Sequence, residues 1–84
     1  MTDQIHKIII RVAKKDSSYV YFTLEANEGL CFYSTLDHQK ESPHREIEIN
    51  LTSSLLNEFL TVFSFLNKTI EITILEDNDN ILGR

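Results

Sequence analysis

Few residues of this 84-residue chain are of types that do covalent chemistry. Its one thiol belongs to Cys31, and a reactive cysteine needs nearby positive charge or a helix N-terminus to stabilise the thiolate. No lysine or histidine stands beside Cys31, and it falls within an expected strand. We therefore interpret it as a small apolar residue and predict no catalytic residue and no enzymatic activity. His6 stands alone near a strand end and is expected to be structural or exposed.

Two histidines and two acids gather in one polar segment. His38 and His44, with Asp37 and Glu41, are residue types that bind metals. Their spacing matches no established metal motif, and all four suit a solvated loop. The acidic stretch at 77–80 lacks the glycine and the glutamate that a calcium loop requires. The sequence thus predicts no metal site and no cofactor.

Hydrophobic periodicity predicts four strands and two helices. Alternation of period two marks the strands, whereas a broader apolar arc marks the helices. The expected strands cover residues 5–12, 30–37, 45–51 and 69–75, and the expected helices cover 17–28 and a second segment that starts from a cap at Thr52 or Ser53. Asp16 is expected to cap the first helix, and Gly29 to follow its end in a left-handed conformation.

The phase of each strand predicts which side chains lie under the helices. The expected inward set is Ile8, Ile10, Val12, Leu30, Phe32, Ile47, Ile49, Ile70 and Ile72. The first helix is expected to bury Tyr19, Val20, Phe22, Leu24 and Ala26, and the second Leu55, Leu56, Phe59, Leu60, Val62, Phe63 and Leu66. Ile81 and Leu82 either dock back onto the domain or belong to a frayed tail from about residue 77.

The order strand, helix, strand, strand, helix, strand predicts an α+β fold, a ferredoxin-like βαββαβ sandwich over residues 1–84. Its two helices would cover one face of a four-stranded antiparallel sheet in the order 4-1-3-2. That order places the outward Lys7 and Arg11 of the first strand between strands that carry Glu46, Glu48 and Glu71. Such cross-strand pairs contribute about 0.2–1 kcal/mol each, so they support the topology without dictating it.

Composition excludes several function classes. The net charge is −5, and the main basic cluster is Arg11, Lys14 and Lys15, which is too small for a nucleic-acid footprint. A single cysteine fits a reducing, cytoplasmic setting. No signal peptide is visible, and no apolar run approaches the roughly 20 residues of a membrane span. We therefore expect neither nucleic acid nor a membrane as a partner.

The stretch KDSSYVYFTLEANEGLCFYSTLD, residues 15–37, resembles a family of short bacterial proteins of unknown function. The matching positions are Lys15–Asp16, Tyr19, Phe22, Leu24–Glu25, Glu28–Gly29–Leu30 and Ser34–Thr35–Leu36–Asp37. The resemblance implies an ACT-like ferredoxin fold and a bacterial source, and it carries over no catalytic residue. ACT domains bind amino acids near the turn after their first strand, which often contains glycine. The corresponding segment here, residues 13–16, has none.

Three function classes are open at this point, and an enzyme ranks last among them. The first is a small regulatory or ligand-binding module that acts as a homodimer, and the alternative is a structural or protein-interaction module without a ligand. A small anionic or amino-acid-like ligand is expected at the start of the first helix, at Lys14, Lys15, Asp16, Ser17 and Ser18. A dimer interface is expected on the outward face and the edge formed by the second strand, at Ile9, Cys31, Tyr33 and Thr35.

Overall fold

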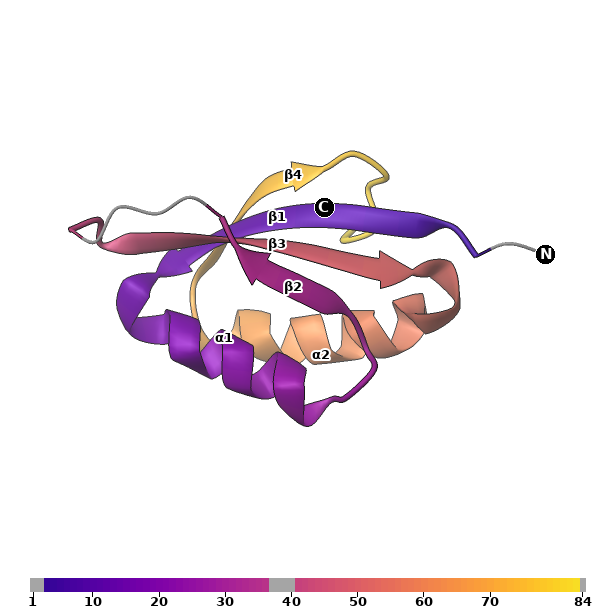
Figure 1. The fold of residues 1–84 in the computed structure, drawn as a ribbon, viewed down its shortest axis with the longest axis horizontal. Helices are drawn as coiled ribbons and strands as arrows, with labels where there is room; N and C mark the ends of the chain where they lie inside the picture. The colour runs from indigo at the N-terminus through magenta and orange to yellow at the C-terminus, as the bar shows by residue number, and fades with distance from the viewer. Residues whose placement is uncertain (1–2, 37–40, 84) are drawn as a thin grey trace.

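The structure is a computed structural model that describes residues 3–36 and 41–83. These described residues form four strands, two α-helices and one short 3-10 helix (Figure 1). The elements are β1 (Ile5–Ala13), α1 (Lys14–Ala26), β2 (Phe32–Thr35), β3 (His44–Thr52), η1 (Ser53–Leu55), α2 (Leu56–Thr69) and β4 (Ile72–Asp77). Among the described residues, no helix is long and apolar enough to cross a membrane.

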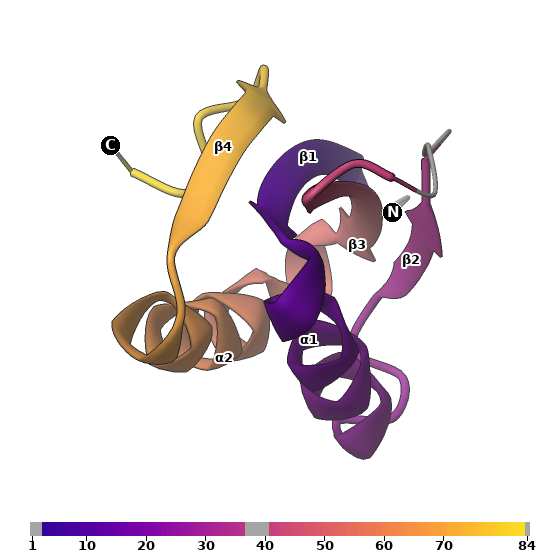
Figure 2. The same ribbon diagram turned by 90° about the vertical axis from the view of Figure 1, so that its left-hand side faces the viewer.

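The four strands form one antiparallel sheet in the order β2-β3-β1-β4. Counted from the β4 edge this is 4-1-3-2, which confirms the predicted ferredoxin-like α+β fold. Both helices lie on the same side of the sheet, as the end view in Figure 2 shows. The basic strand β1 lies between two acidic ones, because Arg11 pairs in register with Glu46 of β3 and the Lys7 ammonium lies 3.2 Å from the Glu76 carboxylate of β4. Glu71, expected to supply the charge of the last strand, precedes β4, so that part of the prediction is wrong.

Strict alternation on the two central strands builds the core. Ile8, Ile10 and Val12 of β1 are buried, and the register places Ile8 opposite Ile49 and Ile10 opposite Ile47. The helices cover this layer with Val20, Leu24, Phe59, Phe63 and Leu66. The inward predictions for β1 and β3 are therefore confirmed. A slip of one residue in the pairing would expose all of these inward side chains, so the burial of one face determines which side chains of each strand face the helices.

The first helix begins earlier than predicted. It starts at Lys14, directly after β1, and Ala13 occupies the N-cap position without a side-chain hydrogen bond. The prediction that Asp16 is the cap is wrong, since Asp16 lies within the first turn, where a carboxylate interacts favourably with the helix dipole. The carbonyl of Pro43 accepts a hydrogen bond of 2.7 Å from the backbone N–H of Lys14. A contact from the segment before β3 thus satisfies an N–H group at the helix start.

The buried stripe of α1 is narrower than the predicted arc. Only Val20 and Leu24, four residues apart, are fully buried, whereas Phe22 is 71% exposed and the prediction for it is wrong. Tyr21, expected on the wet side, packs against the core. Gly29 has a φ of 81°, which confirms its left-handed conformation, but it lies beyond the C-cap residue Asn27.

The second strand has the opposite phase to the prediction. Phe32, expected under the helices, is 81% exposed. Tyr33 and Thr35, expected to point away, lie in register opposite the buried Ile49 and Ile47 of β3 and therefore face the helices. A strand of four residues with apolar side chains on both faces does not define its own phase, so pairing with β3 decides it.

Contacts with α1 confirm the orientation of Tyr33. Its ring stacks on Tyr21, with centroids 5.2 Å apart and planes inclined by 18°. Its hydroxyl donates a hydrogen bond of 2.7 Å to the Glu25 carboxylate, and Tyr21 is hydrogen bonded through its own hydroxyl to Thr35. The predicted placement of Tyr33 and Thr35 on the outward face is therefore wrong.

The last strand also differs from its predicted range of residues 69–75. Because α2 continues to Thr69, β4 begins only at Ile72 and ends at Asp77. A register shift between Ile9 and Ile10 leaves Leu75 without a partner on β1, as in a β-bulge.

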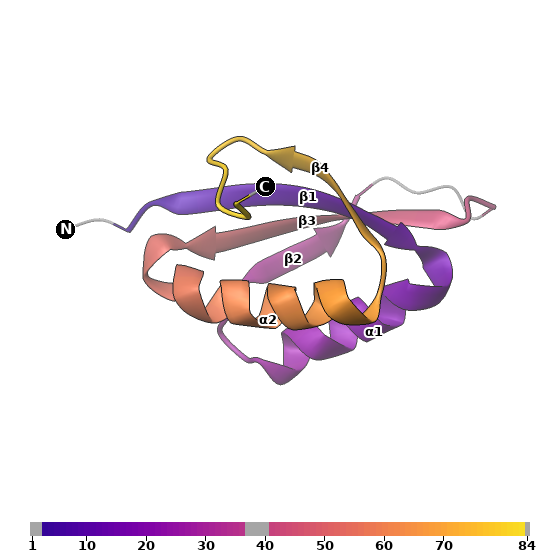
Figure 3. The same ribbon diagram turned by 180° about the vertical axis from the view of Figure 1, so that it is seen from behind.

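The segment after β4 turns back beside β1 (Figure 3). The Asp77 carboxylate accepts hydrogen bonds from the backbone N–H groups of Ile81 and Leu82, at 2.9 and 3.0 Å. Both side chains pack against the core. Of the two alternatives for this segment, the structure therefore has the docked one.

Candidate functional site

A polar cavity lies where the carboxyl end of β1 meets the start of α1. Its volume is about 440 Å³. Its lining residues are Arg11, Ala13, Lys15, Asp16, His44, Thr69, Ile70, Glu71 and Thr73. They come from the β1–α1 junction, the first residue of β3, and the connection from α2 into β4. Sites for small molecules typically measure about 300–1,000 Å³, so this cavity has the size of a ligand site.

The topology explains why these side chains meet. Arg11 projects from the outward face of β1, opposite Thr73 of β4. Lys15 and Asp16 follow in the first turn of α1 because the chain passes from strand to helix without a loop. Glu71 stands between α2 and β4, at the same end of the sheet. Residues far apart in the sequence are thus brought to one end of the central strand.

Charged side chains of both signs line this cavity. It presents the cations of Arg11 and Lys15, the carboxylates of Asp16 and Glu71, and the imidazole of His44. Within the described residues, the ion pair of Lys7 with Glu76 and the hydrogen-bonded contact of His6 with Asp79 involve no cavity residue. The cavity charges remain available to bind a charged ligand.

The predicted ligand residues are only partly brought together. Lys15 and Asp16 line the cavity, whereas Lys14, Ser17 and Ser18 do not. The Ser17 hydroxyl instead donates a hydrogen bond of 2.8 Å to the Lys14 carbonyl. The prediction assumed a turn over residues 13–16, but these residues are the end of β1 and the first turn of α1.

Sequence reasoning missed Arg11, His44, Thr69, Glu71 and Thr73 as cavity residues. A signal for Arg11 was present, because the predicted phase of the first strand already placed it outward, near the start of the first helix. The others come from segments whose proximity depends on how β3 and β4 align with β1. No local pattern contains that information.

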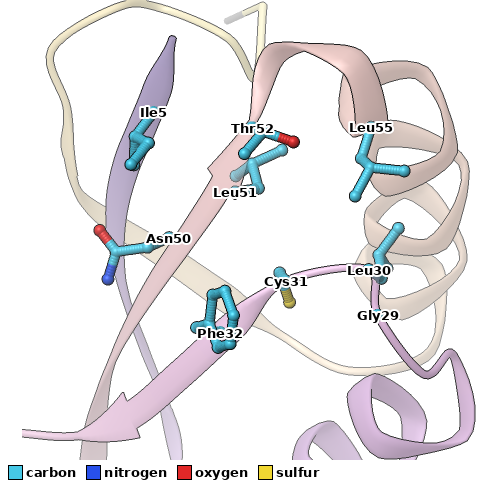
Figure 4. A pocket seen from close by; sticks show the side chains of 9 residues that line it. All are labelled: Ile5, Gly29, Leu30, Cys31, Phe32, Asn50, Leu51, Thr52 and Leu55. Carbon is cyan, nitrogen blue, oxygen red and sulfur yellow. The ribbon is translucent and has the colours of Figure 1, made fainter. Parts of the chain in front are cut away.

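A second, apolar pocket lies at the other end of the sheet (Figure 4). Pairing between β2 and β3 ends at Phe32 and Asn50, so Leu51 and Thr52 have no partner on β2. The resulting gap of about 100 Å³ is lined by Ile5, Gly29, Leu30, Cys31, Phe32, Asn50, Leu51, Thr52 and Leu55. It is smaller than an ordinary small-molecule site.

Cys31 lines this apolar pocket and is half-buried. Burial raises the pKa of its thiol from 9.0 to about 11. Thiolate, the reactive form, is therefore rare at neutral pH. This environment agrees with the interpretation of Cys31 as a small apolar residue, but its expected position within a strand is wrong, because β2 begins at Phe32. Cys31 also packs toward the core rather than onto the open outward face.

An open edge accompanies the apolar pocket. β2 pairs with β3 on one side only and lies at the edge of the sheet. Phe32 and Ile5, which both line the pocket, are 81% and 67% exposed. Of the predicted interface residues, Ile9 is outward and partly buried between Glu48 and Glu76, while Cys31, Tyr33 and Thr35 lie on the helix side. The dimer itself stays a prediction.

The candidate metal ligands are not all described. Asp37 and His38 lie outside the described residues, and His44 and Glu41 are exposed. Among residues 3–36 and 41–83, no three His, Cys, Asp or Glu side chains come together as metal ligands. His6, in contrast, is buried and hydrogen bonded, which confirms the structural alternative for it.

No protein-family model matches the chain, and no curated protein or solved structure matches it. The family resemblance of residues 15–37 therefore stays a prediction. The fold and the side-chain geometry are what support a function.

Proposed function

We propose that this domain is a small binding module, and that the polar cavity holds a ligand with both a carboxylate and an ammonium group, as in an amino acid. One observation carries the proposal: two cations and two carboxylates line a single cavity and form no ion pair with a described residue. The Arg11 guanidinium can hold a carboxylate through two parallel hydrogen bonds. Asp16 or Glu71 can accept hydrogen bonds from an ammonium group.

The mixed charges favour a zwitterion over a simple anion. A ligand with only negative charge would be attracted by Arg11 and Lys15 but repelled by Asp16 and Glu71. A zwitterion complements both pairs. The position after the first strand agrees with the resemblance to ACT-like domains, with Lys15 and Asp16 supplying side chains where those domains often have glycine. A regulatory role follows if such a module reports the level of an amino acid to a partner.

Nuclear magnetic resonance titration of the whole chain tests the proposal. Each common amino acid is added to about 10 mM, since a millimolar dissociation constant corresponds to only about −4 kcal/mol. We expect saturable shifts of the backbone amides of Ala13, Lys15, Asp16 and Glu71 for at least one amino acid. Acetate and ethylammonium, which each carry one of the two charges, should produce weaker shifts at the same positions.

Two charge-matched variants sharpen this test. Arg11→Gln removes a cavity cation and should abolish the shifts, whereas Lys7→Gln removes a cation from the other end of β1 and should preserve them. The proposal is wrong if no amino acid moves the cavity amides. It is also wrong if both variants weaken binding equally, because that result indicates a general effect of net charge.

A specific observation favours self-association as a second function. The residues of β2 carry no charge, so two copies can approach along this edge despite a net charge of −5 on each chain. An unpaired strand edge with an exposed aromatic side chain is normally covered by another segment or by a second chain. Antiparallel pairing of β2 with β2 of a second copy would join two sheets and shelter Phe32 and Ile5.

Light scattering coupled to size exclusion tests this association. We expect a dimer mass for the parent chain and a monomer for Phe32→Asp. Phe65→Asp is the matched control, because Phe65 is also exposed but lies on α2, away from β2. A monomer mass for the parent chain at tens of micromolar refutes the dimer, and equal effects of the two variants refute the assigned surface.

A further inference from the structure

A second polar cluster lies near the start of β1, at the opposite end of that strand from the polar cavity. It joins His6 of β1, Ser53 of η1 and Asp79 of the segment after β4. The Nδ1 atom of His6 lies 2.7 Å from the Asp79 Oδ2, and its Nε2 atom lies 2.8 Å from the Ser53 Oγ. A hydroxyl, an imidazole and a carboxylate thus stand in series, the arrangement that activates a serine nucleophile.

The fold holds the three groups by independent means. The antiparallel register of β1 and β3 continues into a hydrogen bond of 2.9 Å from the Ser53 N–H to the Gln4 carbonyl, which places Ser53 beside His6. His6 is 7% exposed, and hydrogen bonds at both ring nitrogens hold the orientation of its ring. Asp79 arrives on the tail that the Asp77 carboxylate anchors.

Hydrogen-bond chemistry assigns the protons in this cluster. A carboxylate only accepts hydrogen bonds, so the proton of a neutral His6 ring is on Nδ1, facing Asp79. Its Nε2 atom then carries a lone pair and accepts from the Ser53 hydroxyl. The other acceptor near that hydroxyl, the Gln4 carbonyl, is farther away at 3.3 Å. The closer partner of the Ser53 proton is therefore a base.

We propose that Ser53 is a nucleophile that takes the acyl group of small activated carboxylic esters, with His6 as the general base and Asp79 as a positioning residue. The acyl group must be small because His6 is buried and Ser53 is half-buried. An acetyl group is small enough to meet this limit. This activity goes beyond the proposed binding function and uses none of the cavity residues.

The reaction balances without a cofactor. The Ser53 oxygen bonds to the ester carbonyl carbon while its proton moves to the His6 Nε2, and Asp79 continues to accept the Nδ1 proton. The carbon–oxygen bond to the alcohol then breaks, and the alcohol leaves with the proton from Nε2. Water next attacks the acyl-serine, gives one proton to Nε2, and releases the carboxylic acid as Ser53 regains its proton.

The full chain incubated with p-nitrophenyl acetate tests the proposal. Release of p-nitrophenolate gives the rate, and peptide mass mapping locates the acetyl group. We expect acetylation at Ser53 in the parent and none at that position in Ser53→Ala. General-base catalysis is typically worth about 100-fold or more, so His6→Gln should slow acetylation of Ser53 by at least about that factor. The proposal is overturned if the folded parent releases p-nitrophenolate no faster than Ser53→Ala and carries no acetyl group on Ser53.

Two neighbours in the chain serve as matched controls. Ser54→Ala removes the adjacent serine, whose hydroxyl donates to Asp3, and should leave the rate unchanged. Asp77→Asn weakens the hydrogen bonds that anchor the same tail and contacts His6 only through Asp79, whereas Asp79→Asn alters the carboxylate that faces the ring. We expect Asp79→Asn to slow acetylation by at least about tenfold and by more than Asp77→Asn does, and Asp79→Glu to restore part of the rate.

These controls separate chemistry from folding. Circular dichroism melting establishes that each variant is folded. If His6→Gln does not fold, Asp79→Asn still decides the outcome, because the Asp79 side chain is 44% exposed and its loss leaves no buried charge in the core. Equal slowing by Asp77→Asn and Asp79→Asn would show that only tail docking matters, and this result overturns the catalytic assignment.

Discussion

Replacing Tyr33 or Phe32 by alanine tests the phase of β2. The two residues are adjacent aromatics on the same edge strand, and only their facing differs. In the structure Tyr33 packs on α1, whereas Phe32 is 81% exposed. Tyr33→Ala should therefore lower the free energy of unfolding much more than Phe32→Ala. The phase predicted from the sequence alone requires the opposite ranking.

The magnitude follows from the contacts of Tyr33. Its stacked contact with Tyr21, at 5.2 Å between centroids, contributes about 0.5–1.5 kcal/mol. Partial burial of the ring adds about 1 kcal/mol, roughly half of what a fully buried aromatic side chain gains. The hydrogen bond to Glu25 adds about 0.5–1 kcal/mol. Tyr33→Ala should thus cost about 2–3.5 kcal/mol, against less than about 0.5 kcal/mol for the mostly exposed Phe32.

Urea unfolding followed by circular dichroism measures both changes. For a domain of this size, each 1 kcal/mol corresponds to about 4–8 °C in Tm, so thermal melting provides a second measure. The chain is kept dilute, so that self-association through Phe32 does not contribute to the apparent stability. A loss for Phe32→Ala equal to or greater than that for Tyr33→Ala refutes the assigned phase.

Four further outcomes follow from the core and from the perturbed pKa values. Ile10→Asp places an unpaired charge at a fully buried site and should abolish cooperative unfolding; a melting curve like that of the parent would show that the inward face of β1 is misassigned. Burial raises the pKa of Cys31 from 9.0 to about 11, so at about pH 8 its thiolate fraction is about 100-fold lower than in the unfolded chain. Ellman's reagent should react correspondingly slowly in buffer and fast in urea, and equal rates contradict the buried position. The contribution of this thiol to stability should be complete below pH 9 and should disappear as the pH rises through about 11. The hydrogen bond to Glu25, with smaller effects of burial and neighbouring charge, raises the pKa of Tyr33 to about 12, and ultraviolet titration should show Glu25→Gln returning it toward 10.

The long, regular elements could be predicted from the sequence. The inward residues of β1 and β3 agree with the alternation in the sequence, because nine-residue strands with one apolar face leave a single favourable phase. The strand order follows from the βαββαβ sequence of elements. By contrast, the start of α1 at Lys14 has no local signal, because a contact with the Pro43 carbonyl replaces a side-chain cap.

The candidate sites were much harder to predict. Lys15 and Asp16 could be found from their position after the first strand, but Glu71 and His44 join them only when β3 and β4 align with β1. Along the chain, Ser53 lies 47 residues from His6, and Asp79 lies 73 residues from His6. No short motif links them, so the sequence alone suggested only a structural or exposed His6.

The amino-acid sequence by itself determined the set of periodic elements and the apolar faces that must be buried. Those depend on interactions between residues a few positions apart, which a linear pattern records. The phase of β2, the docking of the tail, the polar cavity and the His6 cluster were decided only by the tertiary structure. Each depends on side chains from distant segments meeting at the ends of one central strand, and a short edge strand takes its phase from the neighbour with which it pairs.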